Sequence, residues 1–150
     1  MSHVLGRHLS GSAEQTEALG VQLAAKLSRG DVVLVEGELG AGKTTFVRAA
    51  CRALGVKGAV TSPTFTIGQR YAAPVPVSHV DLYRVPRLAD EDPDLLADYL
   101  GPDTIAFVER QPAPGTQRGV EEEAVTGLAR IAARVRIEHA GGDRRVVEIE

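Results

Sequence analysis

The segment Gly37–Thr44, which reads Gly-Glu-Leu-Gly-Ala-Gly-Lys-Thr, constrains the fold of this chain more than any other feature. It matches the G-x-x-x-x-G-K-[ST] pattern of a phosphate-binding loop, which lies between a buried strand and the helix that follows it. Both flanks have this context. The apolar run Val32–Val35 is typical of a strand buried on both faces, and a helical pattern follows up to Gly55. A strand, a glycine-rich turn and a helix in this order begin a βαβ unit, so the sequence predicts an α/β fold.

Each position of the motif has a physical reason. Glycines allow the tight turn that points consecutive N–H groups at a phosphate, and the start of the next helix adds its own unpaired N–H groups and positive dipole end. Lys43 supplies a cation for the β- and γ-phosphates, and the Thr44 hydroxyl is placed to bind Mg²⁺. The chain has only three lysines, so composition alone does not explain one at this position. The motif therefore predicts binding of a nucleotide phosphate.

Length and composition limit the classes of protein to consider. The chain has 150 residues, a hydrophobic content of 43% and a formal net charge of −3. These values predict one domain over 1–150 and argue against a general nucleic-acid coat or a polybasic membrane anchor. We expect no membrane partner, because no apolar run approaches the roughly 20 residues that cross a bilayer and the first ten residues do not resemble a signal peptide. The single cysteine, Cys51, excludes an intrachain disulfide and favours a reducing, cytoplasmic location.

Other patterns complete the expected sheet. Ser12 and Gln15 fit a capping box at the start of an N-terminal helix, and Asp92 is a candidate N-cap for a second helix. Strands are expected near the runs 75–82 and 104–109, and alternation over 135–139 and 147–149 predicts a terminal β-hairpin. The expected architecture is a mostly parallel central sheet, flanked by helices, with an antiparallel C-terminal edge hairpin.

Two acids are expected at the carboxyl ends of neighbouring strands, where open α/β sheets bind ligands. Glu109 follows a buried run and Asp81 ends another. Either residue can hold Mg²⁺ or orient the attacking group, and a surface carboxylate is the alternative for each. His79 lies two residues before Asp81, and a lone histidine beside a strand is more often structural.

The hydroxyl-rich segment 61–66 lies between the loop helix and the Asp81 strand. In many phosphate-loop enzymes this interval senses the γ-phosphate and becomes ordered around Mg²⁺. Thr61 or Thr64 can serve that purpose, and a polar turn fixed by Pro63 is the alternative. The order of the elements along the chain leaves both readings open.

Several segments together resemble one family, TsaE (also called YjeE), the small bacterial ATPases that act in threonylcarbamoyladenosine modification of tRNA. They are Gly37–Thr45, the segment Ser-Pro-Thr-Phe-Thr over 62–66, the segment His-Val-Asp-Leu-Tyr-Arg over 79–84, and Phe107–Glu109. Their order and spacing fit from about Leu9 to Ile149. The resemblance implies a P-loop NTPase fold that hydrolyses ATP to ADP and phosphate and requires Mg²⁺.

The resemblance also implies roles for particular residues. Catalysis would involve Lys43, Asp81 and Glu109, with Asp81 positioning or activating water and with Thr44 and Glu109 as Mg²⁺ ligands. The switch loop would include Ser62 and Thr64. The nucleotide phosphates would contact the phosphate loop, and Thr16 and Arg145 are the candidates for contact with adenine. The full set of nucleotide-binding candidates is Thr16, Glu38, Leu39, Gly40, Ala41, Gly42, Lys43, Thr44, Thr45 and Arg145.

One position departs from the family pattern. Family members usually carry tryptophan directly after the magnesium glutamate, whereas Arg110 follows Glu109 here and the chain has no tryptophan. A guanidinium in place of a large aromatic ring changes both packing and charge beside the expected site. The change does not affect the phosphate loop itself.

The resemblance implies that the protein docks on the TsaD–TsaB complex, hydrolyses ATP to reset that complex between turnovers, and meets tRNA only indirectly. Slow hydrolysis by the isolated protein would fit a site that a partner completes. Two alternatives stay open. One is a small-molecule kinase on the same scaffold, although the acidic stretch after Pro86 does not resemble an arginine-rich lid. The other is a nucleotide-gated interaction module with little turnover, a possibility that Arg110 keeps open.

Overall fold

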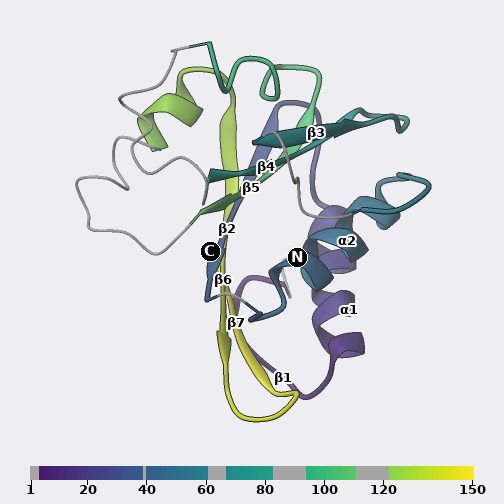
Figure 1. Ribbon diagram of the computed structural model, residues 1–150, viewed down its shortest axis with the longest axis vertical. Coiled ribbons are helices and arrows are strands. Elements are labelled where there is room, and N and C mark those ends of the chain that lie inside the picture. Colours follow the sequence, from purple (N-terminus) through teal and green to yellow (C-terminus); the bar gives the residue numbers. More distant parts are fainter. Residues whose placement is uncertain (1–3, 39, 61–66, 83–93, 111–121) are drawn as a thin grey trace.

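The computed structural model describes residues 4–38, 40–60, 67–82, 94–110 and 122–150. The strands of these residues form one seven-stranded sheet in the order β1-β7-β6-β2-β5-β4-β3 (Figure 1). In chain order the elements are β1 (Gly6–Ser10), α1 (Ala13–Ala24), β2 (Asp31–Gly37), α2 (Lys43–Ala53), β3 (Gly68–Tyr71), β4 (Val77–Asp81), β5 (Ile105–Arg110), β6 (Arg130–His139) and β7 (Arg145–Ile149). The mixed α/β fold with a mostly parallel core is thereby confirmed.

The four central strands, β6, β2, β5 and β4, are mutually parallel. Each is rich in apolar residues that point to both faces, and β2 and β5 are buried along their whole length. This is the pattern expected of parallel strands covered on both sides. Because the strands run in one direction, β2, β4 and β5 end at the same edge of the sheet.

The terminal hairpin of β6 and β7 is antiparallel, as predicted, but it is not the edge of the sheet. β1 pairs antiparallel with β7 and forms the outer strand on that side. On the opposite side, β3 pairs antiparallel with β4. Neither outer strand has clear alternation of apolar and polar residues. Their extended conformation therefore depends on pairing with β7 and β4 more than on their own sequences.

Helices α1 and α2 pack against each other and cover one face of the sheet (Figure 1). The predicted start of α1 is confirmed, because the Ser12 hydroxyl accepts a hydrogen bond of 3.2 Å from the N–H of Gln15. The Gln15 side chain in turn accepts from the N–H of Gly11 at 2.5 Å. A buried cluster on this face joins the helices to β2, and it includes Leu23, Phe46 and Val33.

The two helices approach most closely at Gly20, and we expect Gly20→Ala to destabilise the protein. A β-carbon at this position would lie 2.5 Å from the carbonyl oxygen of Phe46, which is backbone and cannot rotate away. The overpacking should cost about 1–3 kcal/mol, more than the roughly 1 kcal/mol that alanine gains over glycine in a helix. Urea unfolding measures the difference. Gly101→Ala is the control, since no atom lies within 4 Å of its added β-carbon, and a lower stability of that control alone would contradict the packing argument.

The other face of the sheet carries a second buried cluster, which includes Leu34, Val80 and Val108. Residues 122–126 form a short helix, and Val125 packs into this cluster together with Leu96 and Leu100. The helix expected after Asp92 is not found in the described residues, because 94–99 form successive turns. The hydrogen bonds from Ala97 to Asp94 and from Tyr99 to Leu96 span three residues, and a single bond from Leu100 to Leu96 spans four, which is not enough for a continuous α-helix.

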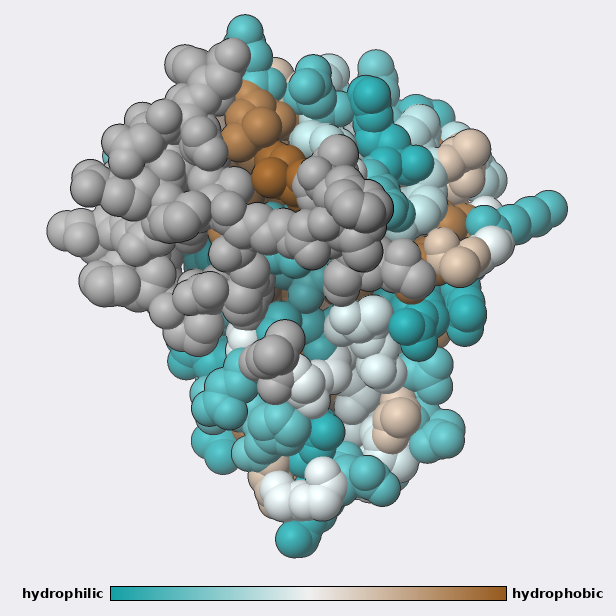
Figure 2. Space-filling model, in the orientation of Figure 1, coloured by the Kyte–Doolittle hydropathy of each residue, from teal (hydrophilic) through white to brown (hydrophobic). Residues whose placement is uncertain are grey.

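The described surface is largely hydrophilic in the view of Figure 2, and hydrophobic side chains gather in the upper part of that view. Large hydrophobic residues that are clearly exposed among the described residues are few: Leu5, Leu9 and Val21. No helix in the described part of the chain is long and apolar enough to cross a membrane.

Candidate functional site

The candidate site begins where β2 ends and the chain turns into α2. Two glycines are required there by the backbone. A β-carbon at Gly37 would collide with the carbonyl oxygen of Ile137 on β6, and Gly42 caps α2 with a φ of 105°, in the left-handed region that favours glycine. The predicted glycine-rich turn between a buried strand and a helix is thus confirmed. Its backbone geometry places the first N–H groups of α2 at the loop, which is the arrangement that binds anions.

Lys43 spans this loop from the first turn of α2. Its Nζ donates to the carbonyl oxygens of Gly37 at 2.7 Å and Glu38 at 2.9 Å, and the residue is only 7% exposed. Burial lowers the pKa of its ammonium group, and three nearby carboxylates oppose this shift: Glu109, Asp81 and Glu38. The structure therefore brings the loop lysine into the electrostatic field of both acids that strand topology predicted.

Asp81 and Glu109 are aligned neighbours at the ends of β4 and β5. Val35 of β2 is in turn aligned with Glu109, so the three strands deliver the two acids and the loop to one edge of the sheet. Glu109 is 4% exposed and Asp81 is partly exposed. The structure thus brings the two carboxylates together and buries Glu109, and their chemical roles stay predictions.

The donor set at this edge suits Mg²⁺ chemically. Mg²⁺ prefers oxygen ligands, and in nucleotide sites it is held by one or two protein groups together with phosphates and water. Thr44, the second residue of α2, supplies a hydroxyl, and Glu109 and Asp81 supply carboxylate oxygens on the neighbouring strands. Thr44 and Glu109 would be the protein ligands.

His79 is a member of this site that the sequence left as a lone strand histidine. It is fully buried, and its Nε2 contacts the Glu109 Oε2. A carboxylate oxygen accepts hydrogen bonds, so the imidazole donates through Nε2. The signal available in the sequence was its position two residues before Asp81, which places both side chains on the same face of β4.

A pocket beside the loop contains both residues proposed for adenine, and Ala13, Thr16, Gly42, Thr45, Asp143 and Arg145 line it. The Arg145 Nε donates to the carbonyl oxygen of Ala41 at 2.9 Å, so β7 holds the loop backbone directly. The Thr16 hydroxyl pairs with the Ser10 hydroxyl at 2.7 Å. The structure thus joins these two distant positions at the phosphate loop, and contact with a base remains a prediction.

The remaining predicted residues lie as follows. Glu38 and Gly40 are exposed in the loop, Ala41 is buried, and Thr45 is half-buried in the first turn of α2. Leu39, Ser62 and Thr64 lie outside the described residues, so the switch-loop prediction is not tested by the structure.

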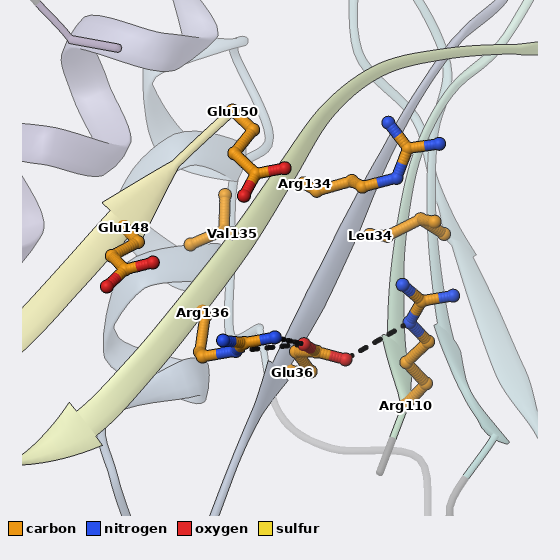
Figure 3. A pocket seen from close by; sticks show the side chains of 8 residues that line it. All are labelled: Leu34, Glu36, Arg110, Arg134, Val135, Arg136, Glu148 and Glu150. Carbon is orange, nitrogen blue, oxygen red and sulfur yellow. Dashed lines mark hydrogen bonds and ion pairs between the residues drawn. The ribbon is translucent and has the colours of Figure 1, made fainter. Parts of the chain in front are cut away.

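Arg110 points to the face of the sheet opposite Lys43, into an ion-pair network (Figure 3). It is 3% exposed, and its guanidinium lies 3.4 Å from Glu36 and 2.9 Å from Glu122. Arg136 binds Glu36 from β6 with hydrogen bonds of 3.0 and 2.9 Å. The contact between Glu36 and Arg110 joins the residue before Gly37 to the residue after Glu109. Arg110, which stands where the resemblance implies tryptophan, therefore links β2 to β5.

The network predicts an acid-sensitive contribution to stability at Glu122. Hydrogen bonds from Arg134 and then Arg110 lower the pKa of Glu122 from 4.5 to about 2, although burial opposes them. A depressed folded-state pKa stabilises the protein above the unfolded value, and this stabilisation is lost as the pH falls from about 4.5 to about 2. In urea unfolding, the free energy of unfolding of wild type should therefore exceed that of Glu122→Gln by a constant difference near neutral pH. This difference should shrink as the pH falls into the acid range. The stability difference that Glu122→Gln causes should be smaller in an Arg134→Met background. A difference that does not change with pH would contradict the lowered pKa of Glu122.

Comparison with known proteins identifies the family of this chain. The family model described as "Threonylcarbamoyl adenosine biosynthesis protein TsaE" matches residues 10–145. A Streptomyces coelicolor protein named tRNA threonylcarbamoyladenosine biosynthesis protein TsaE is 41% identical over 128 residues, which is 83% of this chain and 80% of that protein. The Bacillus subtilis protein of the same name is 43% identical over 98 residues, which is 64% of this chain and 60% of that protein.

A solved structure agrees with these matches. The crystal structure of Bacillus subtilis YdiB is similar to this fold with a TM-score of 0.68 and 30% sequence identity, covering 94% of this chain and 81% of that one. The matched range 10–145 contains the whole phosphate loop, Asp81 and Glu109. The chain therefore belongs to the TsaE family.

Proposed function

We propose that the protein is a Mg²⁺-dependent ATPase that acts in threonylcarbamoyladenosine modification of tRNA. The observation that carries the proposal is the convergence of Lys43 with Asp81 and Glu109 at one edge of the sheet. A phosphate loop alone indicates binding. A loop with two strand-end acids beside its lysine also provides the groups that phosphoryl transfer to water requires.

Each group has a defined task in this proposal. The N–H groups at the start of α2 and the ammonium of Lys43 bind the β- and γ-phosphates and offset their charge as the terminal bond breaks. Bound Mg²⁺, held through Thr44 and Glu109, would neutralise charge on the phosphate oxygens. Asp81 orients a water for in-line attack on the γ-phosphorus and accepts its proton, so the products are ADP and inorganic phosphate.

The pocket at Thr16 and Arg145 is our candidate for the adenine. Gly42 and Thr45 of the loop region line it as well, so a nucleotide whose phosphates occupy the loop can place its base in the adjoining pocket. Arg145 already holds the loop backbone through Ala41. A base stacked or packed on this arginine would therefore be coupled directly to the conformation of the loop.

The biological setting is proposed from the relatives, whose name refers to tRNA threonylcarbamoyladenosine biosynthesis. We propose that the protein docks on the TsaD–TsaB complex, that ATP hydrolysis resets the complex between turnovers, and that tRNA is met only through the complex. A cytoplasmic location belongs to this proposal. Cys51 is a free, fully buried thiol whose pKa burial raises to about 12, which fits a structural role.

The nucleotide-gated module is the second candidate, and Arg110 is the observation that supports it. The position carries a buried, ion-paired guanidinium where the family carries tryptophan. In that case the protein would bind ATP with Mg²⁺ and hardly turn it over.

The test is release of inorganic phosphate from ATP with and without Mg²⁺ in a single-turnover assay that contains no other acceptor. The proposal expects equal amounts of ADP and phosphate, and no release in the presence of a chelator. Tight binding without release would favour the gated module. In a second reaction that contains a small-molecule acceptor, transfer of the γ-phosphate to that acceptor in place of water would favour a kinase.

A further inference from the structure

His79 lies inside the sheet at the centre of the candidate site, yet it cannot itself reach solvent. It is 0% exposed on β4, aligned with Phe107 of β5, and its side chain shares a face with Val77 and Asp81. Its Nε2 contacts the Glu109 Oε2 across the strand pair. The only acid it touches among the described residues is therefore the one proposed to hold Mg²⁺.

An imidazole at this depth is costly for the fold. Its Nδ1 is buried and has no hydrogen-bond partner among the described residues. A buried polar atom without a partner destabilises a protein by about 1–3 kcal/mol. An apolar residue would pack against Phe107 and Val77 without that cost, so the contact with Glu109 is the property that distinguishes histidine here.

The contact also constrains a side chain that would otherwise have rotational freedom. Glu109 lies near the end of a buried strand and has three side-chain torsions to fix, and its charge acts on the ammonium of Lys43. Carboxylates that bind metals are commonly held by a hydrogen bond from a second residue, and loss of such a partner typically lowers metal affinity or activity by about 10–100-fold.

We propose that His79 is a positioning residue that orients the Glu109 carboxylate for the Mg²⁺–nucleotide complex. This inference rests on the proposed function, because it requires Glu109 to meet the metal. The orienting interaction is the hydrogen bond from His79 Nε2 to Glu109, and a side-chain amide of suitable length can supply the same donor. His79 has no exposed surface, so we infer that it acts through its contact with Glu109.

The experiment measures metal affinity rather than turnover. Mn²⁺ replaces Mg²⁺, a non-hydrolysable ATP analogue occupies the site, and electron paramagnetic resonance reports free Mn²⁺. His79→Leu, which removes the donor at similar volume, should weaken Mn²⁺ binding about 10–100-fold, while affinity for the analogue without metal stays the same. His79→Asn should behave like His79→Leu because it is too short to reach Oε2, and it serves if the leucine variant does not fold. His79→Gln should restore most of the affinity.

Two controls separate positioning from general damage. Ser78→Ala removes the neighbouring buried hydroxyl, which has no hydrogen-bond partner among the described residues, and it should leave metal affinity unchanged. In a Glu109→Gln background, His79→Leu should have no further effect on metal affinity, because the two residues act as one unit.

The proposal is overturned if His79→Leu binds Mn²⁺ as tightly as wild type, or if its effect persists in the Glu109→Gln background. If wild type binds the metal–nucleotide complex and His79→Leu does not, but ATP is never hydrolysed, the positioning role stands and the proposed ATPase fails. If wild type shows no metal-dependent binding at all, both are contradicted.

Discussion

Replacement of Lys43 by methionine should lower ATP turnover by about 10²–10³-fold, the effect of removing one preorganised group that stabilises charge in the transition state. Methionine keeps most of the buried stem but loses the ammonium, which donates to Gly37 and Glu38 in the loop. Without this cation the terminal phosphate loses the positive charge that the loop lysine supplies. Affinity for ATP should fall as well, because the same charge meets the ground-state triphosphate.

The matched control is Lys57→Met, which removes an exposed lysine outside the site. Its turnover and affinity should equal those of wild type. Circular dichroism and urea unfolding establish that both variants fold. Normal turnover in folded Lys43→Met would show that the loop lysine has no part in the chemistry.

Replacement of Asp81 by asparagine should separate hydrolysis from binding. The carboxylate is proposed to accept the proton of the attacking water, and loss of a general base typically lowers the rate by about 10²–10⁴-fold. Affinity for ATP should be kept or slightly raised, because a negative charge near the phosphates is removed while the loop is unchanged. Single-turnover phosphate release and titration with a fluorescent nucleotide measure the two quantities.

Asp98→Asn is the control for Asp81, since it makes the same chemical change at an exposed position in the turns of 94–99. We expect no change in either quantity. If Asp81→Asn loses no turnover, the hydrolytic role of this residue is wrong. If it loses affinity and turnover equally, Asp81 is a binding group.

The parts of the fold that the sequence predicts are those with strong local signals. The glycine-rich turn between β2 and α2, the Ser12 cap of α1 and the parallel core follow from motif spacing, capping chemistry and apolar runs. The positions of Asp81 and Glu109 follow from topology, because the carboxyl ends of parallel strands meet at one edge. The outer strands β1 and β3 were not predicted, since short polar strands become ordered through their partners. The helix expected after Asp92 was wrong, because tight turns that pack Leu96 replace it.

Two features of the site arise only from tertiary packing. The pairing of His79 with Glu109 joins residues on different strands, and the position of His79 two residues before Asp81 indicates a shared face but not this partner. The second is the pairing of Arg110 with Glu36, which are aligned on β5 and β2. Glu36 was the available signal, as an acid that follows the apolar run Val32–Val35 within a buried strand requires a partner. Arg110 is therefore accommodated by ion pairs on the face of the sheet opposite Lys43.

The central claim is that the site hydrolyses ATP in the service of tRNA modification, and the most direct measurement is Mg²⁺-dependent ATP turnover with and without the cognate TsaD–TsaB pair. The blank is Lys43→Ala. The account predicts slow turnover by the protein alone, faster turnover with the pair, and none in the blank under either condition. Turnover that the pair leaves unchanged, whether fast or absent, would contradict it.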